Sequence, residues 1–274
     1  GHPRGITVKD LAPAAIGEAE ELATILSAAR DLDPAVHTTR KGTKRLRSYL
    51  RLAKQSIGTK VYRSENAALR DAARLIAPAR DALVLVETAR EMNASRSVIT
   101  TLEHRHAREM THLESGVRAE AIRRLESVAS RWKGIEWLGP EAASVRAGLA
   151  RTYRRGLADY AAVQAKPNAS GFHTWRRRVK YVRYQLEALG LPRAVTRTWL
   201  TLGDDLGGEH DHTVLIGVCR TYGDDDGFRS LAKRAKARRK ALRATALETG
   251  DRLLVLEPNA FVASVASAAG LEES

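Results

Sequence analysis

Apolar residues recur every three or four positions along most of this chain, which is the spacing of a helix that buries one stripe of its surface. The segment that begins at Phe172 shows the pattern most clearly. Its apolar positions are Phe172, Trp175, Val179, Val182, Leu186 and Leu189, in steps of 3, 4, 3, 4 and 3. No alternating pattern of the kind that predicts strands recurs between turn signals. We therefore predict an all-α protein.

Clusters of turn-forming residues divide the chain into eight or nine predicted helices. Breaks are expected at Asp33-Pro34, around Gly58, at Gly139-Pro140, at Pro167-Asn168, at Gly190 to Pro192 and in Gly223 to Gly227. The predicted spans are residues 8–30, 36–55, 62–91, 96–131, 140–165, 171–189, 193–221 and 227–249, with a short closing helix after Pro258. The best domain seam lies at Gly134 to Gly139, which gives an N-terminal half of residues 1–134 and a C-terminal half of residues 135–274.

One stretch of the chain occurs twice. VHTTRKGTKRLRSYLRLA, which starts at Val36, returns 136 residues later as FHTWRRRVKYVRYQLEAL, which starts at Phe172. A weaker echo pairs Arg80-Asp81 with His210-Asp211. Each half would then hold four helices, a number that can enclose one apolar core with short connections. The sequence predicts two related helical bundles.

A basic stripe follows the apolar seam one position later in each copy of the repeat. Its members are His37, Arg40, Lys44, Arg47 and Arg51 in the first copy, and His173, Arg176, Lys180 and Arg183 in the second. Residues at these spacings share one helix face, and this face adjoins the buried seam. We expect the side chains of both stripes to line a groove between the halves. Each histidine either contacts the ligand or caps the start of its helix.

The alternative is an ordinary solvated face, which mixes charges of both signs. No acidic residue, however, occurs from Pro34 to Ser64 or from Tyr160 to Leu186, and a third acid-free stretch runs from Gly227 to Leu247. These three stretches hold 23 of the 46 basic residues, so the charge is concentrated rather than spread.

The chain carries a formal net charge of +14, which attracts polyanions such as nucleic acid, anionic membranes or polyphosphate. Arginine offers a planar set of paired donors to phosphate oxygens, and lysine offers a charge on a flexible side chain. A helix that carries both suits a linear polyphosphate bound without strict register. Aromatic residues make up only 5% of the chain, and no base-reading helix or aromatic platform is evident. Nonspecific nucleic-acid binding stays as the alternative. No apolar run approaches the length of a membrane span, so we expect no membrane partner.

Metal and catalytic chemistry are not expected. His104 and His106 point opposite ways on a helix, and His210-Asp211-His212 lacks the spacing of a zinc motif. Asp204, Asp205 and Asp211 form the nearest acidic cluster, and helix packing or salt bridges account for them. No phosphate-binding glycine loop or nucleophile motif occurs. We predict a protein without a cofactor or enzymatic activity. Cys219 is the sole cysteine, which favours a reducing, cytoplasmic location.

The chain resembles the CHAD family, the conserved histidine alpha-helical domain, over nearly its full length. The resemblance rests on His37-x-x-Arg40-x-x-x-Lys44-x-x-Arg47, its partner His173-x-x-Arg176-x-x-x-Lys180-x-x-Arg183, the stretch from Leu206-Gly207 to Asp211, and Tyr153-Arg154-Arg155. It implies two four-helix bundles related by a pseudo-twofold axis, with a basic groove or pore that binds inorganic polyphosphate. It also implies association with polyphosphate granules.

On this resemblance the two stripes form opposite walls of the groove. Clustering of charge along two further helices extends its floor with Arg151, Arg154 and Arg155, and with Lys236, Arg239, Lys240 and Arg243. Two departures indicate that the walls need not bind equally. Pro78 stands where the second half has Gly207-Gly208, and Glu187 stands where the first half has Arg51. CHAD domains are often joined to a triphosphatase module of the CYTH type, for which this chain has no length left, so we expect a free-standing binding protein.

Overall fold

The computed structural model describes residues 11–136, 142–223 and 225–271, and its regular elements within these ranges are all helical. The all-α prediction is confirmed. The N-terminal elements are α1 (Leu11–Ala28), α2 (Leu32–Leu52), α3 (Lys54–Ile57), α4 (Thr59–Leu75), α5 (Ala77–Glu91), α6 (Arg96–His112) and α7 (Arg118–Lys133). The C-terminal elements are α8 (Ala142–Ala165), α9 (Ala169–Ala188), α10 (Arg193–Thr221), α11 (Asp226–Leu253) and α12 (Pro258–Ala269).

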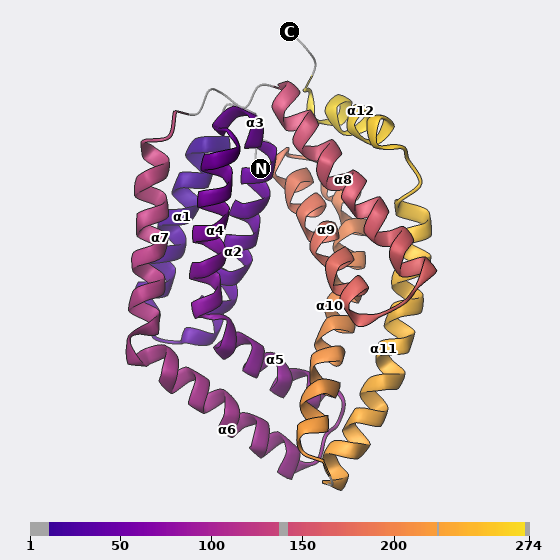
Figure 1. Ribbon diagram of the computed structural model, residues 1–274. Coiled ribbons are helices and arrows are strands. Elements are labelled where there is room, and N and C mark those ends of the chain that lie inside the picture. The colour runs from indigo at the N-terminus through magenta and orange to yellow at the C-terminus, as the bar shows by residue number, and fades with distance from the viewer. Residues whose placement is uncertain (1–10, 137–141, 224, 272–274) are drawn as a thin grey trace.

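Two groups of helices stand side by side (Figure 1). In the first group α1, α2, α4 and α7 pack around a core that includes Leu22, Leu46 and Trp132. In the second group α8, α9, α10 and α12 enclose a core that includes Trp175 and Tyr153, and α11 runs along α10. The pair α5 and α6 crosses from one group to the other and packs against α10 and α11.

The apolar seams of both repeat copies are buried, as predicted. Trp175 and Phe172 are fully buried on α9, and Leu46 and Leu50 are buried on α2. Thr39 and Thr43 take the corresponding places of larger residues in the first copy and are also buried. The same helical register therefore directs both basic stripes away from the cores. The pseudo-twofold relation and the division at residue 134 stay predictions, because residues 137–141 of the connection lie outside the described ranges.

The helices α2 and α9 contact each other through uncharged groups. Ser48 Oγ of α2 donates a hydrogen bond of 2.8 Å to the carbonyl oxygen of Tyr181 on α9. Gln185 Nε2 of α9 donates to Thr152 Oγ1 of α8 at 3.1 Å and to the Ser48 carbonyl at 3.5 Å. These buried bonds form the neutral seam, which we define as Ser48, Tyr181, Gln185 and Thr152.

Several predicted helix boundaries were wrong. The span 62–91 is broken at Ile76, because Pro78 has no N–H to donate and clashes with the preceding turn, so a new helix starts there. The span 96–131 is interrupted by a π-helical turn at Leu113–Val117, where Gly116 has φ of 113°. Twelve α-helices therefore replace the predicted eight or nine within the described residues.

The predicted break at Asp33-Pro34 was also misplaced. α2 begins at Leu32, and the Asp31 carboxylate accepts a hydrogen bond from the Asp33 N–H at 3.2 Å as the helix cap. Proline is tolerated in the first turn of a helix, where its missing N–H would have no intrahelical partner. At the other end α2 stops at Leu52, and the short helix α3 follows it.

Gly148 lets α8 approach the end of α2, and we expect its replacement by alanine to destabilise the protein. An alanine Cβ there would lie 2.6 Å from the Arg51 carbonyl oxygen and 2.7 Å from Leu52 Cα, so backbone must shift. Gly148→Ala should lower the free energy of unfolding by about 1–3 kcal/mol in urea titrations. The control Gly217→Ala, with nothing within 4 Å, should raise it by about 0.5–1 kcal/mol. Equal stability of the two variants would contradict the close approach.

Candidate functional site

Four cationic side chains converge where α2 faces α9. We call Arg40 and Lys44 of α2 with Arg176 and Lys180 of α9 the central cation cluster. The i, i+4 spacing places each pair on one helix face. Arg40 Nη2 lies 3.0 Å from Asp81 Oδ1 of α5. The other three members form no salt bridge with any described carboxylate.

The two lysines of the cluster are strongly desolvated. Burial, followed by the positive charges of Arg40 and Arg176, lowers the pKa of Lys44 to about 7. Burial, followed by Arg176 and Lys44, lowers the pKa of Lys180 to about 6. Both lysines are thus only partly charged at neutral pH. A bound anion would favour their charged forms.

Helix α10 borders the cluster at the stretch from Leu206-Gly207 to Asp211, which is part of the family resemblance. Gly207 faces Arg176, and a Cβ there would lie 3.9 Å from the guanidinium nitrogens. Arg176 Nε is buried without a hydrogen-bond partner. Burial raises the pKa of the Asp211 carboxyl, against the opposing charge of Arg176. Asp81 and Asp211, which the weaker echo in the sequence paired, thus both influence the same cations.

His173 of α9 meets His210 of α10 beside the cluster. Their Nδ1 atoms are 3.2 Å apart, and the ring centroids are 4.6 Å apart with an interplanar angle of 40°. A hydrogen bond between these atoms requires one unprotonated nitrogen. Burial, followed by Arg176 and His173, lowers the pKa of His210 to about 3, so this ring is neutral at physiological pH.

Neither histidine of the repeat caps its helix, so that alternative was wrong. Asn168 caps α9 by accepting a hydrogen bond of 2.9 Å from the Gly171 N–H, and Asp31 caps α2. His37 lies at the surface of α2, where partial desolvation and then the charge of Arg80 lower its pKa. The structure therefore places His173, but not His37, against a partner ring.

The remaining stripe residues have partners of their own. Arg47 Nε donates to Asn66 Oδ1 at 3.0 Å. Arg183 Nε lies 3.4 Å from Glu187 Oε1, and its guanidinium lies 4.5 Å from the Tyr184 ring centroid. Glu187, the repeat counterpart of Arg51, thus reduces the positive charge at the end of the second stripe.

A pocket of about 220 Å³ lies at the end of the first stripe, where Arg51 is one of its lining residues. We call it the Tyr62 pocket. Six of its eight lining side chains are cationic, and Tyr62 and Thr152 complete it. The cationic residues are Arg51, Lys54, Arg63, Arg151, Arg155 and Arg178.

The Tyr62 pocket gathers three predicted residues, Arg51, Arg151 and Arg155, from two helices. Arg154 is exposed and does not line it. The sequence missed Lys54, Arg63 and Arg178 because they fall outside the stripes. The acid-free stretches that contain them were the available signal.

Within the described residues, no hydrogen bond or ion pair joins the predicted α11 residues to the cluster. Arg243 instead donates to Glu209 Oε1 of α10, through Nη2 at 2.6 Å and Nε at 2.9 Å, and Glu209 is 1% exposed. Burial lowers the pKa of Arg239, which is partly buried, whereas Lys236 and Lys240 are exposed. Arg243 therefore has a structural partner.

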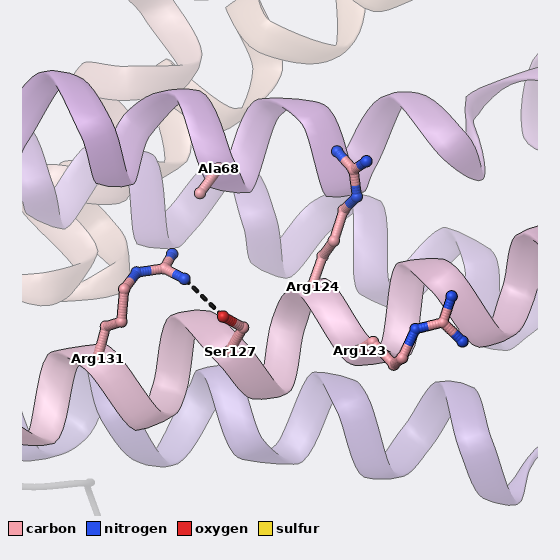
Figure 2. A pocket seen from close by; sticks show the side chains of 5 residues that line it. All are labelled: Ala68, Arg123, Arg124, Ser127 and Arg131. Atoms are coloured by element: carbon pink, nitrogen blue, oxygen red, sulfur yellow. Dashed lines mark hydrogen bonds between the residues drawn. The ribbon is translucent and has the colours of Figure 1, made fainter.

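A second arginine-rich pocket, on α7, has carboxylates beside its arginines. Figure 2 shows Arg123, Arg124 and Arg131 of α7 lining a pocket of about 190 Å³ with Ser127 and Ala68. Glu120 accepts from both Arg123 and Arg124, and Arg131 forms a two-point contact of 2.9 Å with Glu65. Each of these arginines has a carboxylate partner, unlike most members of the central cation cluster.

The fold and the site define an all-helical protein in which two basic helices bring unneutralised cations together. The model of the CHAD domain matches residues 19–220, and the chain therefore belongs to the CHAD family. Its fold is similar to the crystal structure of the CHAD domain from the plant Ricinus communis, with 18% identity and a TM-score of 0.57. That match covers 98% of this chain and 94% of the plant chain. Comparison with curated proteins gives no significant match.

No helix among the described residues combines the length and apolar character that crossing a membrane requires. No group of three or more His, Cys, Asp or Glu side chains in the same part of the chain is arranged to hold a metal ion.

Replacing the cluster lysines by methionine should stabilise the free protein. The unfolded chain binds more protons than the folded one at pH values between the lowered lysine pKa and the ordinary one near 10.5, so wild-type stability should rise with pH across this window. Lys44→Met with Lys180→Met should raise Tm at pH 7 by a few degrees, which corresponds to an increase of roughly 1 kcal/mol in the free energy of unfolding. The variant should also show a smaller rise in Tm between pH 7 and 9.

The matched control is Lys41→Met, an exposed lysine on α2. Its Tm should follow the wild type at both pH values. A double variant that is less stable than wild type at pH 7 would show that the buried lysines do not destabilise the fold.

Proposed function

We propose that this protein binds inorganic polyphosphate at the central cation cluster and does not hydrolyse it. The observation that carries this proposal is the charge surplus of the cluster. Its four cations face two nearby carboxylates, Asp81 and Asp211, and the pKa of Asp211 is raised by burial. Such a surplus is costly in a partly desolvated site unless an anion joins it.

The arrangement of the cations favours a linear polyanion. Stripe residues three or four positions apart lie about 5 Å apart along the helix axis, so they offer successive charges to a repeating chain. Arginine presents paired donors to phosphate oxygens, and lysine adds a mobile charge. Arg47 continues the stripe of α2 beyond Lys44. We propose that the chain lies along Arg40, Lys44 and Arg47.

The proposal of binding without catalysis rests on the surroundings of the carboxylates. Asp81 is paired with Arg40, and Asp211 belongs to a different helix, where burial raises its pKa against the opposing charges of Arg176 and Lys180. Divalent-metal hydrolysis of phosphates uses grouped carboxylates that hold the metal. A protein that binds without cleaving would accumulate where polyphosphate does, and we propose association with polyphosphate granules.

Calorimetric titration with long-chain polyphosphate and with duplex DNA, at matched phosphate and physiological salt, tests this function. We expect polyphosphate to bind more tightly than DNA, with no orthophosphate released during prolonged incubation with magnesium or manganese. Lys44→Glu with Lys180→Glu should weaken polyphosphate binding about 100-fold or more, because each reversal removes a cation and adds repulsion.

The control for that variant is Lys41→Glu with Arg177→Glu, which makes the same charge change at exposed positions of α2 and α9. It should weaken binding far less. Equal affinity for DNA and polyphosphate would instead indicate a general polyanion surface, and metal-dependent orthophosphate release would contradict the noncatalytic function.

Polyphosphate affinity should fall as pH rises from about 6 to 8.5. The lysine pKa values of about 6 and about 7 belong to the free protein, and a bound anion raises them, so binding takes up protons in this window. Each proton taken up changes affinity by about tenfold per pH unit. Titrations in two buffers of different ionisation enthalpy measure this uptake. Lys44→Met with Lys180→Met should abolish most of it.

A further inference from the structure

The Tyr62 pocket carries more uncompensated positive charge than the pocket on α7. Of its six cations, Arg178 alone has a carboxylate partner, with Nε 3.1 Å from Asp159 Oδ2. Arg51, Lys54, Arg63, Arg151 and Arg155 form no salt bridge with a described carboxylate. The pocket in Figure 2 also holds arginines, but each of them has a carboxylate partner.

Part of the pocket is preorganised. Arg51 Nη1 donates to the Arg47 carbonyl, and its guanidinium lies 3.8 Å from the Tyr181 ring centroid. Arg151 Nη2 donates to the Arg51 carbonyl at 3.2 Å. Carbonyl partners fix the orientation of a guanidinium without cancelling its charge. A ligand therefore meets these two arginines already in place, which reduces the ordering cost of binding.

The pocket is separate from the central cation cluster. The two sites share no residue, and Arg51 follows Lys44 by seven positions, or about 10 Å along α2. Burial lowers the pKa of Arg51. The charged and polar groups that also act on this pKa are Tyr181, Tyr62, Arg47 and Arg178, and none of them belongs to the cluster. In the second copy of the repeat the position of Arg51 is Glu187, which pairs with Arg183.

The size and lining of the pocket restrict its ligand. Its volume of about 220 Å³ is below the roughly 300 Å³ at which pockets for drug-sized molecules begin. One phosphate carries roughly two negative charges and would leave most of the surplus uncompensated. Lys54 Nζ lies 5.4 Å from the Tyr62 ring centroid, and Arg51 covers Tyr181, so cations already occupy the aromatic faces on which a base would stack.

We propose that the Tyr62 pocket is a discrete site for two or three consecutive inorganic phosphates, which it binds independently of the central cation cluster. The ligand is a free short oligophosphate or the end of a longer chain, since both present the same groups. This site goes beyond long-chain binding at the cluster and does not require it.

Calorimetry with pyrophosphate, tripolyphosphate and long-chain polyphosphate tests the site in the full chain. Arg63→Glu should weaken tripolyphosphate binding at least tenfold, whereas Lys60→Glu, an exposed neighbour on α4 outside the pocket, should change it less than threefold. Lys44→Met with Lys180→Met should leave tripolyphosphate binding within threefold of wild type. ATP should bind no more tightly than tripolyphosphate. Far-ultraviolet circular dichroism verifies that each variant is folded.

Chains of graded length distinguish the two sources of the ligand. If the pocket takes chain ends, Arg63→Glu should weaken long-chain binding increasingly as the chains shorten; if it takes only free oligophosphate, long-chain binding stays unchanged. Loss of tripolyphosphate binding in the lysine variant as well would overturn the separate site. Wild-type binding of long chains without short ones would overturn this proposal alone, and the reverse would overturn only the long-chain function.

Discussion

The neutral seam between α2 and α9 is the contact on which the rest of the structure depends. Each helix presents cations toward the other without an acid of its own in the facing stripe. Two unit charges about 8 Å apart repel by roughly 2 kcal/mol at an effective dielectric constant near 20. Attraction must therefore come from uncharged groups. The buried bonds of Ser48 and Gln185 provide it, and α8, which bonds to Gln185 and closely approaches α2 at Gly148, supports both helices. Burial, and after it the repulsion that remains, lowers the pKa values of the cluster lysines.

The pairing of individual cations tells more about function than the net charge of the chain. Arg243 and Arg131 each have a buried carboxylate partner, Glu209 and Glu65, and these pairs hold helices together. Lys44 and Lys180 have none. A net charge of +14 does not show which cations have a carboxylate partner and which have none. Only the three-dimensional assignment of partners separates structural arginines from cations that are left for a ligand.

The sequence predicted the members of the central cation cluster because helical periodicity places them on one face of each helix. A repeat with fixed register sets Lys44 and Lys180 beside buried seams, and the long-range contact of α2 with α9 brings the two faces together. The Tyr62 pocket depends on features that periodicity does not contain. Gly58, with φ of 78°, starts α4 in the direction that brings Arg63 to the pocket. The partner of Arg243 lies 34 residues away on another helix, so charge clustering along α11 could not distinguish it from its exposed neighbours.

The two sites lie on one helix, and this has different consequences for short and long ligands. Their separation of about 10 Å is comparable to the Debye length of about 8 Å at physiological salt, so occupation of one site weakens the other only modestly. A short oligophosphate bound in the Tyr62 pocket should then leave the cluster available. A chain long enough to reach both sites binds the second as an intramolecular step, with a high effective concentration. Arg47, held by Asn66 between the two sites, adds an intermediate charge to such a path. Selectivity for chain length can thus arise from the spacing of two modest sites rather than from one strong one.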